Sequence, residues 1–84
     1  MEEEREYHRR YLRAVNNLLR RTILQVLKDC DMSFNELQSK LDLDEENLRW
    51  HLHILENGYC IKKVNKEDQV FYRSTQEGNI VDSL

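Results

Sequence analysis

The chain has 84 residues, of which 39% are hydrophobic and 35% are charged, and it contains no proline. This length suits one small domain over residues 1–84 with a modest core, and no apolar run is long enough to span a membrane. The first residues, Glu2-Glu3-Glu4-Arg5-Glu6, do not resemble a signal peptide, so the expected location is the cytoplasm.

The formal net charge of −3 opposes binding to nucleic acid, but the charges are unevenly distributed. Residues 1–28 carry seven Lys and Arg and four Glu, a balance of +3. Residues 29–58 carry two cations and eight acids, a balance of −6, whereas residues 59–84 carry four of each. A DNA-binding surface would therefore use both ends of the chain around an acidic middle.

Residues 3–29 are predicted to be helical, with a break or bend near Asn16-Asn17. One apolar stripe at helical spacing contains Tyr7, Tyr11, Ala14, Val15 and Leu18. This stripe either covers the core of its own domain or forms a dimer seam. A domain this small gains from pairing, which favours a homodimer through an N-terminal helix over residues 1–17, with interface residues Tyr7, Tyr11 and Val15.

If this helix is continuous, its opposite side carries the arginines Arg5, Arg9, Arg13 and Arg20. They form either a solvated face, paired in part with neighbouring glutamates, or a face that contacts phosphates through Arg9 and Arg13. From Leu19 onward, apolar residues point one way as far as Leu27, which predicts a core helix.

Residues 33–57 have the pattern of two short helices joined by a tight turn. Ser33-Phe34-Asn35-Glu36 is a capping-box sequence, and the helix that it opens is expected to run to about Lys40. A second helix over 44–57 starts at the N-cap candidate Asp44 and stops at Gly58. Its buried face contains Leu48, Leu52 and Leu55, with His51 at the edge; its other face contains Glu46, Asn47, Arg49, Trp50, His53 and Ile54.

After Gly58, residues 59–64 and 69–74 are rich in β-branched and aromatic side chains, and the polar tip 65–68 lies between them. This pattern predicts a β-hairpin, the wing, over residues 59–75. Residues 76–84 are expected to form a short turn or helix, or to fray. The fold class is therefore mainly α with a small β-hairpin (α+β), a winged helix-turn-helix.

Cys30 and Cys60 lie thirty residues apart, and neither belongs to a closely spaced cysteine pair. Each is expected to be a small buried apolar residue, with a disulfide as the alternative. No metal or other cofactor is expected. The chain also has no nucleophile with a matched base and no glycine-rich phosphate loop, so we do not expect an enzyme.

Residues 18–75 resemble winged-helix regulators of the arsenic-repressor (ArsR-like) type, as found in archaea and bacteria. The likeness is carried by residues 19–24, 33–37, 41–43, 48–52, 55–58 and 71–75. It implies a dimeric, sequence-specific regulator of transcription that binds double-stranded DNA, here interpreted as a repressor of archaeal or archaeal-virus type.

The chain also departs from this family in four ways. Asp42 stands where the turn often has glycine, and three acids begin the second helix where the family often has Ser or Thr. That helix also stops about one residue early. The metal-sensing cysteine pair of the family is absent from residues 37–47, so metal sensing is not implied.

On the DNA hypothesis the helix 44–57 enters the major groove, where Arg49 can pair with guanine and Asn47 with adenine. Trp50 and His53 lie on the same exposed face. The wing would touch phosphates or the minor groove with Lys62, Lys63, Lys66 and Arg73. Arg73 could instead be tied to an acid of the helix-turn-helix.

The alternative function is a winged-helix module that binds protein without binding DNA. Its interface would be centred on Trp50 and Ile54. The charge of −6 over residues 29–58 favours this alternative, whereas the basic N-terminal stripe and the wing lysines favour DNA.

Overall fold

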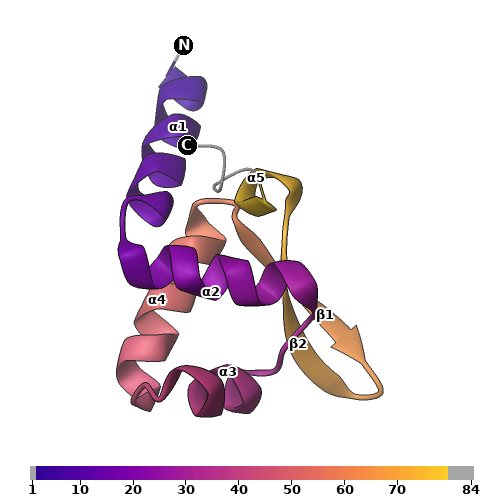
Figure 1. Cartoon of the computed structure of the whole chain (residues 1–84). Helices are drawn as coiled ribbons and strands as arrows, with labels where there is room; N and C mark the ends of the chain where they lie inside the picture. The colour runs from indigo at the N-terminus through magenta and orange to yellow at the C-terminus, as the bar shows by residue number, and fades with distance from the viewer. Residues whose placement is uncertain (1, 80–84) are drawn as a thin grey trace.

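A computed structural model describes the backbone of residues 2–79 and the side chains of residues 5–79. Its elements in chain order are α1 (Glu2–Val15), α2 (Leu18–Asp29), α3 (Phe34–Leu41), α4 (Glu45–Asn57), β1 (Ile61–Lys66), β2 (Gln69–Ser74) and α5 (Gln76–Asn79). Helices α2 to α4 and the β1–β2 hairpin form a winged helix, and α1 extends beyond it on the side away from the wing (Figure 1). The predicted fold class is confirmed. Of the predicted C-terminal turn or helix, residues 80–84 lie outside the described residues.

The N-terminal helical stretch is divided at Asn16-Asn17, as predicted. Asn17 is the N-cap of α2: its backbone is extended, and its side chain accepts a hydrogen bond from the Arg20 amide at 3.0 Å. Because α2 leaves in a new direction (Figure 1), the prediction that Leu18 joins the tyrosine stripe is wrong, and Leu18 is exposed. Arg20 likewise does not continue the arginine row of α1.

The core lies where α1, α2, α3, α4 and the start of β1 meet. Its buried apolar residues are Ala14, Val15, Ile23, Leu24, Leu27, Leu37, Leu48, Leu52, Ile54, Leu55, Cys60 and Ile61. The presence of Val15 corrects its assignment to a dimer seam, because a side chain that is 2% exposed has no surface to offer a second chain. No helix within residues 2–79 is long and apolar enough to cross a membrane.

The two cysteines differ in their surroundings. Cys60 is buried as expected, and burial followed by the charge of Glu77 raises the pKa of its thiol to about 11. Cys30 is exposed, contrary to the expectation, because it follows the last residue of α2 at the surface. Both thiols are free.

Gly58 ends α4, but not through the left-handed backbone that a glycine after a helix usually adopts. Its φ of −91° lies outside the left-handed region, and the left-handed residue is the next one, Tyr59, with φ of 63°. A β-carbon on Gly58 would lie 2.5 Å from the Ala14 β-carbon and 2.7 Å from the Arg10 carbonyl oxygen. Glycine is therefore required because α1 packs directly against the end of α4.

The wing is an antiparallel hairpin in which Ile61 pairs with Ser74 and Lys66 with Gln69. Its turn is shorter than the predicted 65–68 tip: only Glu67 and Asp68 lie between the strands, and both have positive φ, as a type I′ turn requires. An antiparallel bridge between Met32 and Tyr72, which no sequence pattern predicts, joins the wing to the loop between α2 and α3.

The close approach at Gly58 predicts a clear stability effect. Gly58→Ala should lower the free energy of unfolding by about 1–3 kcal/mol, because the new methyl group forces α1 away from α4. Urea denaturation would measure the change. The control Ser39→Ala, at an exposed position of α3, should stay within about 0.5 kcal/mol. Equal stability of the Gly58 variant and the unaltered protein would contradict the packing argument.

Candidate nucleic-acid interface

The helix-turn-helix is built by local capping. Ser33 accepts a hydrogen bond from the Glu36 amide, and the Glu36 carboxylate accepts one from the Ser33 amide, so the predicted capping box is present. Asp42 takes the left-handed conformation, with φ of 52° and ψ of 51°, which Asp tolerates better than most residues. This turn directs the chain into α4, whose buried side includes Leu48, Leu52 and Leu55.

The opposite side of α4 is exposed and carries Asn47, Arg49, Trp50 and His53, as predicted. Ile54 does not belong to it: this side chain is 5% exposed and lies in the core. Helix α1 packs against α4 and covers a part of its surface that helical periodicity alone assigns to solvent. The apolar centre expected for a protein-binding module is therefore reduced to Trp50.

Both candidate base-reading side chains are paired with acids at the start of α4, the N-cap residue Asp44 and Glu45 in the first turn. Arg49 Nη2 lies 2.6 Å from Glu45 Oε1, and its guanidinium lies 4.9 Å from the centre of the Phe34 ring. The Asn47 amide donates to the Asp44 carboxylate, which makes no cap hydrogen bond to the helix. Contact with a base would require Arg49 and Asn47 to leave these partners.

Trp50 is 52% exposed and lies close to α1. The Arg13 guanidinium carbon is 5.6 Å from the centre of its ring, a cation–π distance. The structure therefore brings together two predicted contact residues from separate helices. Arg9, by contrast, is on the exposed side of α1, where its Nη1 lies 3.7 Å from Glu6 Oε2.

A buried arginine that the sequence analysis placed at the surface joins α1, α2 and α4. Arg20 donates to the carbonyl oxygens of Ala14 and Arg13, each at 2.9 Å, and its Nη1 lies 3.2 Å from His51 Nδ1 on α4. It thus satisfies carbonyl groups at the end of α1 that have no helical partner. Burial, followed by the charge of Arg20, lowers the pKa of His51, so at neutral pH the ring accepts the hydrogen bond from Arg20.

The four wing cations have different surroundings. Lys66 Nζ and Arg73 Nη2 lie 2.6 and 2.7 Å from the carboxylate of Asp31, in the loop between α2 and α3. Lys63 Nζ lies 3.9 Å from Glu56 Oε1 on α4. Lys62 is exposed and has no ion pair within residues 5–79. Arg73 is tied to an acid, but this acid is Asp31 in the loop before α3, not an acid of the helix-turn-helix over 33–57 as the alternative expected.

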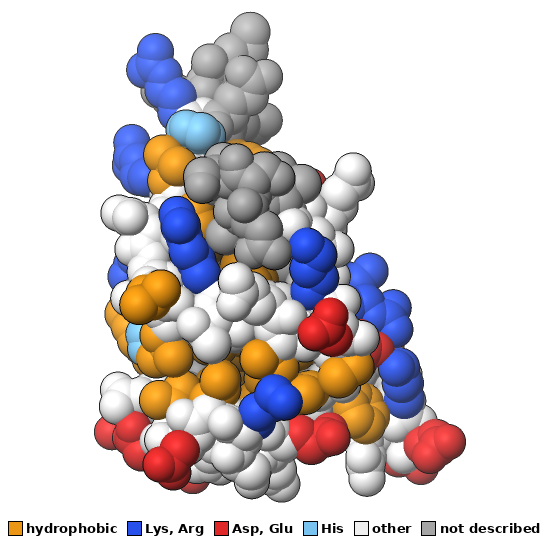
Figure 2. Space-filling model, viewed as in Figure 1, with side chains coloured by type: hydrophobic (Ala, Val, Ile, Leu, Met, Phe, Trp, Pro, Cys, Tyr) orange, Lys and Arg blue, Asp and Glu red, His pale blue; other side chains and the backbone are white. Residues whose placement is uncertain are grey.

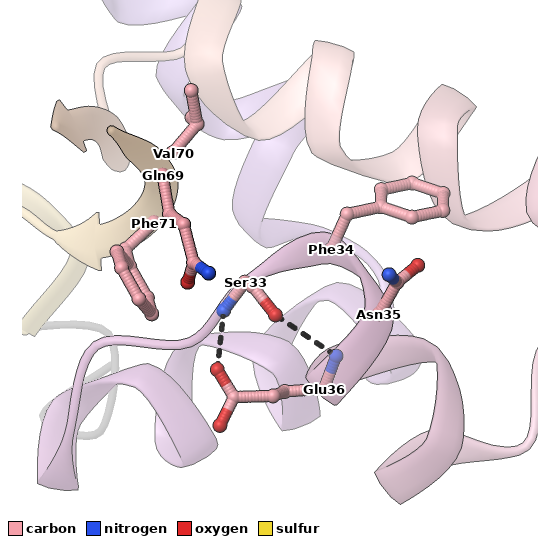
Figure 3. Close-up of a pocket in the computed structure, with 7 residues that line it drawn as sticks. All are labelled: Ser33, Phe34, Asn35, Glu36, Gln69, Val70 and Phe71. Atoms are coloured by element: carbon pink, nitrogen blue, oxygen red, sulfur yellow. Dashed lines mark hydrogen bonds between the residues drawn. The ribbon is translucent and has the colours of Figure 1, made fainter. Parts of the chain in front are cut away.

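An open groove separates the wing from the start of α3. Gln69 and Phe71 point toward Ser33 across it, whereas Phe34 points away from the wing (Figure 3). The Ser33 and Glu36 amides, which could otherwise bind an anion, are used by the capping box. We therefore assign no ligand to this groove.

Charge is separated on the molecular surface. Acidic side chains gather over the turn between α3 and α4 and at the wing tip, while Lys and Arg side chains follow the outer edge of the wing (Figure 2). Within the described residues no group of His, Cys, Asp and Glu is arranged to hold a metal ion.

The two tyrosines predicted at a dimer interface contact their own domain. The rings of Tyr7 and Tyr59 stack with centroids 4.5 Å apart, and the Tyr11 hydroxyl lies 3.5 Å from the Glu77 carbonyl oxygen. Tyr7 nevertheless remains exposed over part of its ring.

No protein-family model matches the sequence, and no curated protein matches it at a significant level. Among solved structures, HlyU from Vibrio cholerae N16961 is 29% identical, with a TM-score of 0.78 over 99% of this chain and 92% of that chain. The transcriptional regulator HlyU from Vibrio vulnificus CMCP6 is 25% identical, with a TM-score of 0.74 over 99% and 88%. An ArsR-like transcriptional regulator from Rhodococcus sp. RHA1 is 18% identical and shares the fold, with a TM-score of 0.82 over 99% and 76%. The chain therefore has the winged-helix fold that ArsR-like regulators adopt.

The Arg20–His51 contact predicts a dependence of stability on pH. The pKa of His51 is lower in the folded than in the unfolded chain. The contribution of neutral His51 to the free energy of unfolding is therefore complete above the unfolded pKa of about 6.5, and it is lost as the pH falls through the folded pKa. Thermal unfolding from about pH 7.5 to about pH 5.5 should therefore show a loss of stability that His51→Gln reduces. The control His53→Gln, at an exposed position, should retain the full loss. An equal loss in both variants would contradict the assignment to His51.

Proposed function

We propose that this chain is a transcription regulator, acting as a repressor in the cytoplasm, that binds double-stranded DNA in a sequence-specific manner. The observation that carries the proposal is the two-sided character of α4: one side is fixed in the core, and the other presents Arg49, Trp50 and His53 to solvent. The likeness of the whole chain to the transcriptional regulator HlyU from Vibrio vulnificus supports the same function.

In this proposal α4 enters the major groove and the wing lies over the flanking backbone. Arg49 exchanges Glu45 for the edge of a guanine, and Asn47 exchanges Asp44 for an adenine. Trp50 contacts a thymine methyl or a sugar, with Arg9 and Arg13 directed at phosphates. His53 and the exposed wing residue Lys62 add backbone contacts. Glu45 and Glu46 oppose phosphates near the start of α4, so binding to unrelated DNA should be weak.

We further propose a homodimer in which α1 contributes to the interface through Tyr7 and Tyr11. The part of α1 that extends beyond the winged helix (Figure 1) supports this arrangement. Two copies would present two α4 helices to half-sites roughly 34 Å apart along one face of the duplex.

The protein-binding alternative retains one supporting observation, the acidic surface around the turn between α3 and α4 (Figure 2). The burial of Ile54 removes half of the apolar centre on which it was based. DNA binding is therefore the better supported function.

The test is fluorescence anisotropy with a labelled duplex from the region upstream of the gene for this chain. We expect tighter binding than to a scrambled duplex, a log–log salt slope that rises by roughly 0.9 for each phosphate contact, and two chains per duplex at saturation. Arg49→Ala should reduce the preference for the specific duplex by about 1–3 kcal/mol, because a bidentate base contact is lost.

Lys40→Ala is the matched control, because it removes an exposed cation of the helix-turn-helix that lies outside α4. It should weaken binding to both duplexes alike. Equal loss of preference in the two variants would exclude Arg49 as a base-reading residue. No binding at low salt would contradict the DNA function and favour a protein partner at Trp50.

A further inference from the structure

One carboxylate outside α4 holds both strands of the wing. Asp31 is in the loop between α2 and α3, and its side chain is 14% exposed. Its Oδ1 accepts a hydrogen bond from Arg73 Nε at 2.9 Å, and its Oδ2 accepts from Arg73 Nη2 at 2.7 Å and from Lys66 Nζ at 2.6 Å. Two parallel bonds from one guanidinium to one carboxylate form a geometrically specific, charge-assisted contact.

The backbone explains why Asp31 reaches these two cations. Met32 and Tyr72 form an antiparallel bridge, with N–O distances of 3.1 and 2.7 Å, so Asp31 lies beside Arg73 on the outer side of β2. Lys66 is at the other end of the hairpin, where β1 enters the turn. The same carboxylate thus contacts β2 near its end and β1 near the tip.

At neutral pH, electrostatic attraction favours the contacts of Asp31 with Arg73 and Lys66. The hydrogen bond from Arg73, followed by that from Lys66, lowers the pKa of Asp31 far below its usual range. Asp31 is therefore charged whenever the wing would meet DNA. If Arg73 moved to a phosphate, one charge-assisted pair would replace another, and the carboxylate would be left to repel the DNA.

Lys62 has a different environment, although it is on the same face of the hairpin. It lies directly opposite Arg73 in the β1–β2 register, is exposed, and makes no ion pair within residues 5–79. Its charge is therefore available to a phosphate without the loss of a carboxylate partner.

We propose that Asp31 is a positioning residue that fixes the wing against the helix-turn-helix before DNA arrives and retains Lys66 and Arg73 as structural cations, leaving Lys62 as the wing cation that contacts DNA. The part concerning Lys62 rests on the proposed DNA function. The part concerning Asp31 is a property of the free protein and is tested without DNA.

The first experiment measures amide hydrogen exchange in free Asp31→Asn. The Met32 and Tyr72 amides, which form the bridge, should exchange at least about fivefold faster, because the charge-assisted bonds that hold the wing are weakened. The amides of α2 should change little. Asp29→Asn is the control, because it removes one negative charge from an exposed neighbour. Acceleration of all amides alike, or equal rates in the two variants, would overturn the positioning role.

The second experiment compares the salt slopes of DNA binding for Lys62→Gln and Lys66→Gln. We expect the first variant to lower the slope by roughly 0.9 and the second to leave it nearly unchanged. If Lys66→Gln lowered the salt slope as much as Lys62→Gln, the assignment of Lys66 as a structural cation and Lys62 as the DNA-contacting cation would be overturned. If the unaltered chain does not bind DNA, the proposed function and the assignment of Lys62 both fail, while hydrogen exchange still decides the role of Asp31.

Discussion

The guanidinium of Arg20 determines how α1 and α4 meet. It lies at the break between α1 and α2, where it satisfies the carbonyl oxygens of Arg13 and Ala14 and contacts His51 on α4. A buried guanidinium without these partners would be strongly destabilising. The close approach of Ala14 to Gly58 fixes α1 against the C-terminal end of α4. The Arg20 contacts and the Ala14–Gly58 contact together place α1 over Ile54, while Trp50 stays exposed.

Acidic residues around α4 and the wing pair with side chains of the candidate DNA surface. Glu45, Asp44 and Asp31 each hold a polar or cationic side chain that was a candidate for DNA contact. An unbound surface with such internal pairs has little attraction for phosphate in general. In the proposed complex, specific DNA must replace the pairs made by Glu45 and Asp44, whereas Asp31 keeps Lys66 and Arg73. The need to replace the pairs on α4 favours discrimination over affinity.

Sequence patterns predicted the features that depend on neighbours along the chain: the break at Asn16-Asn17, the capping box at Ser33 and the hairpin. They failed where contacts come from distant segments. Ile54 and Val15 are buried because α1 packs on the winged helix, and Arg20 is buried because α2 turns away from α1. Nor does any local pattern place Asp31 beside Arg73, since that pair depends on the Met32–Tyr72 bridge.

Whether the exposed side of α4 faces DNA can be decided at Trp50. It is the only tryptophan of the chain, so its indole N–H gives one assignable NMR signal. In a titration with the upstream duplex at moderate salt, this signal should shift in proportion to binding, together with the amide of Arg49, while the amides on the far side of α2 stay in place. Binding that leaves the Trp50 indole signal unchanged would contradict the claim and place the DNA on another surface.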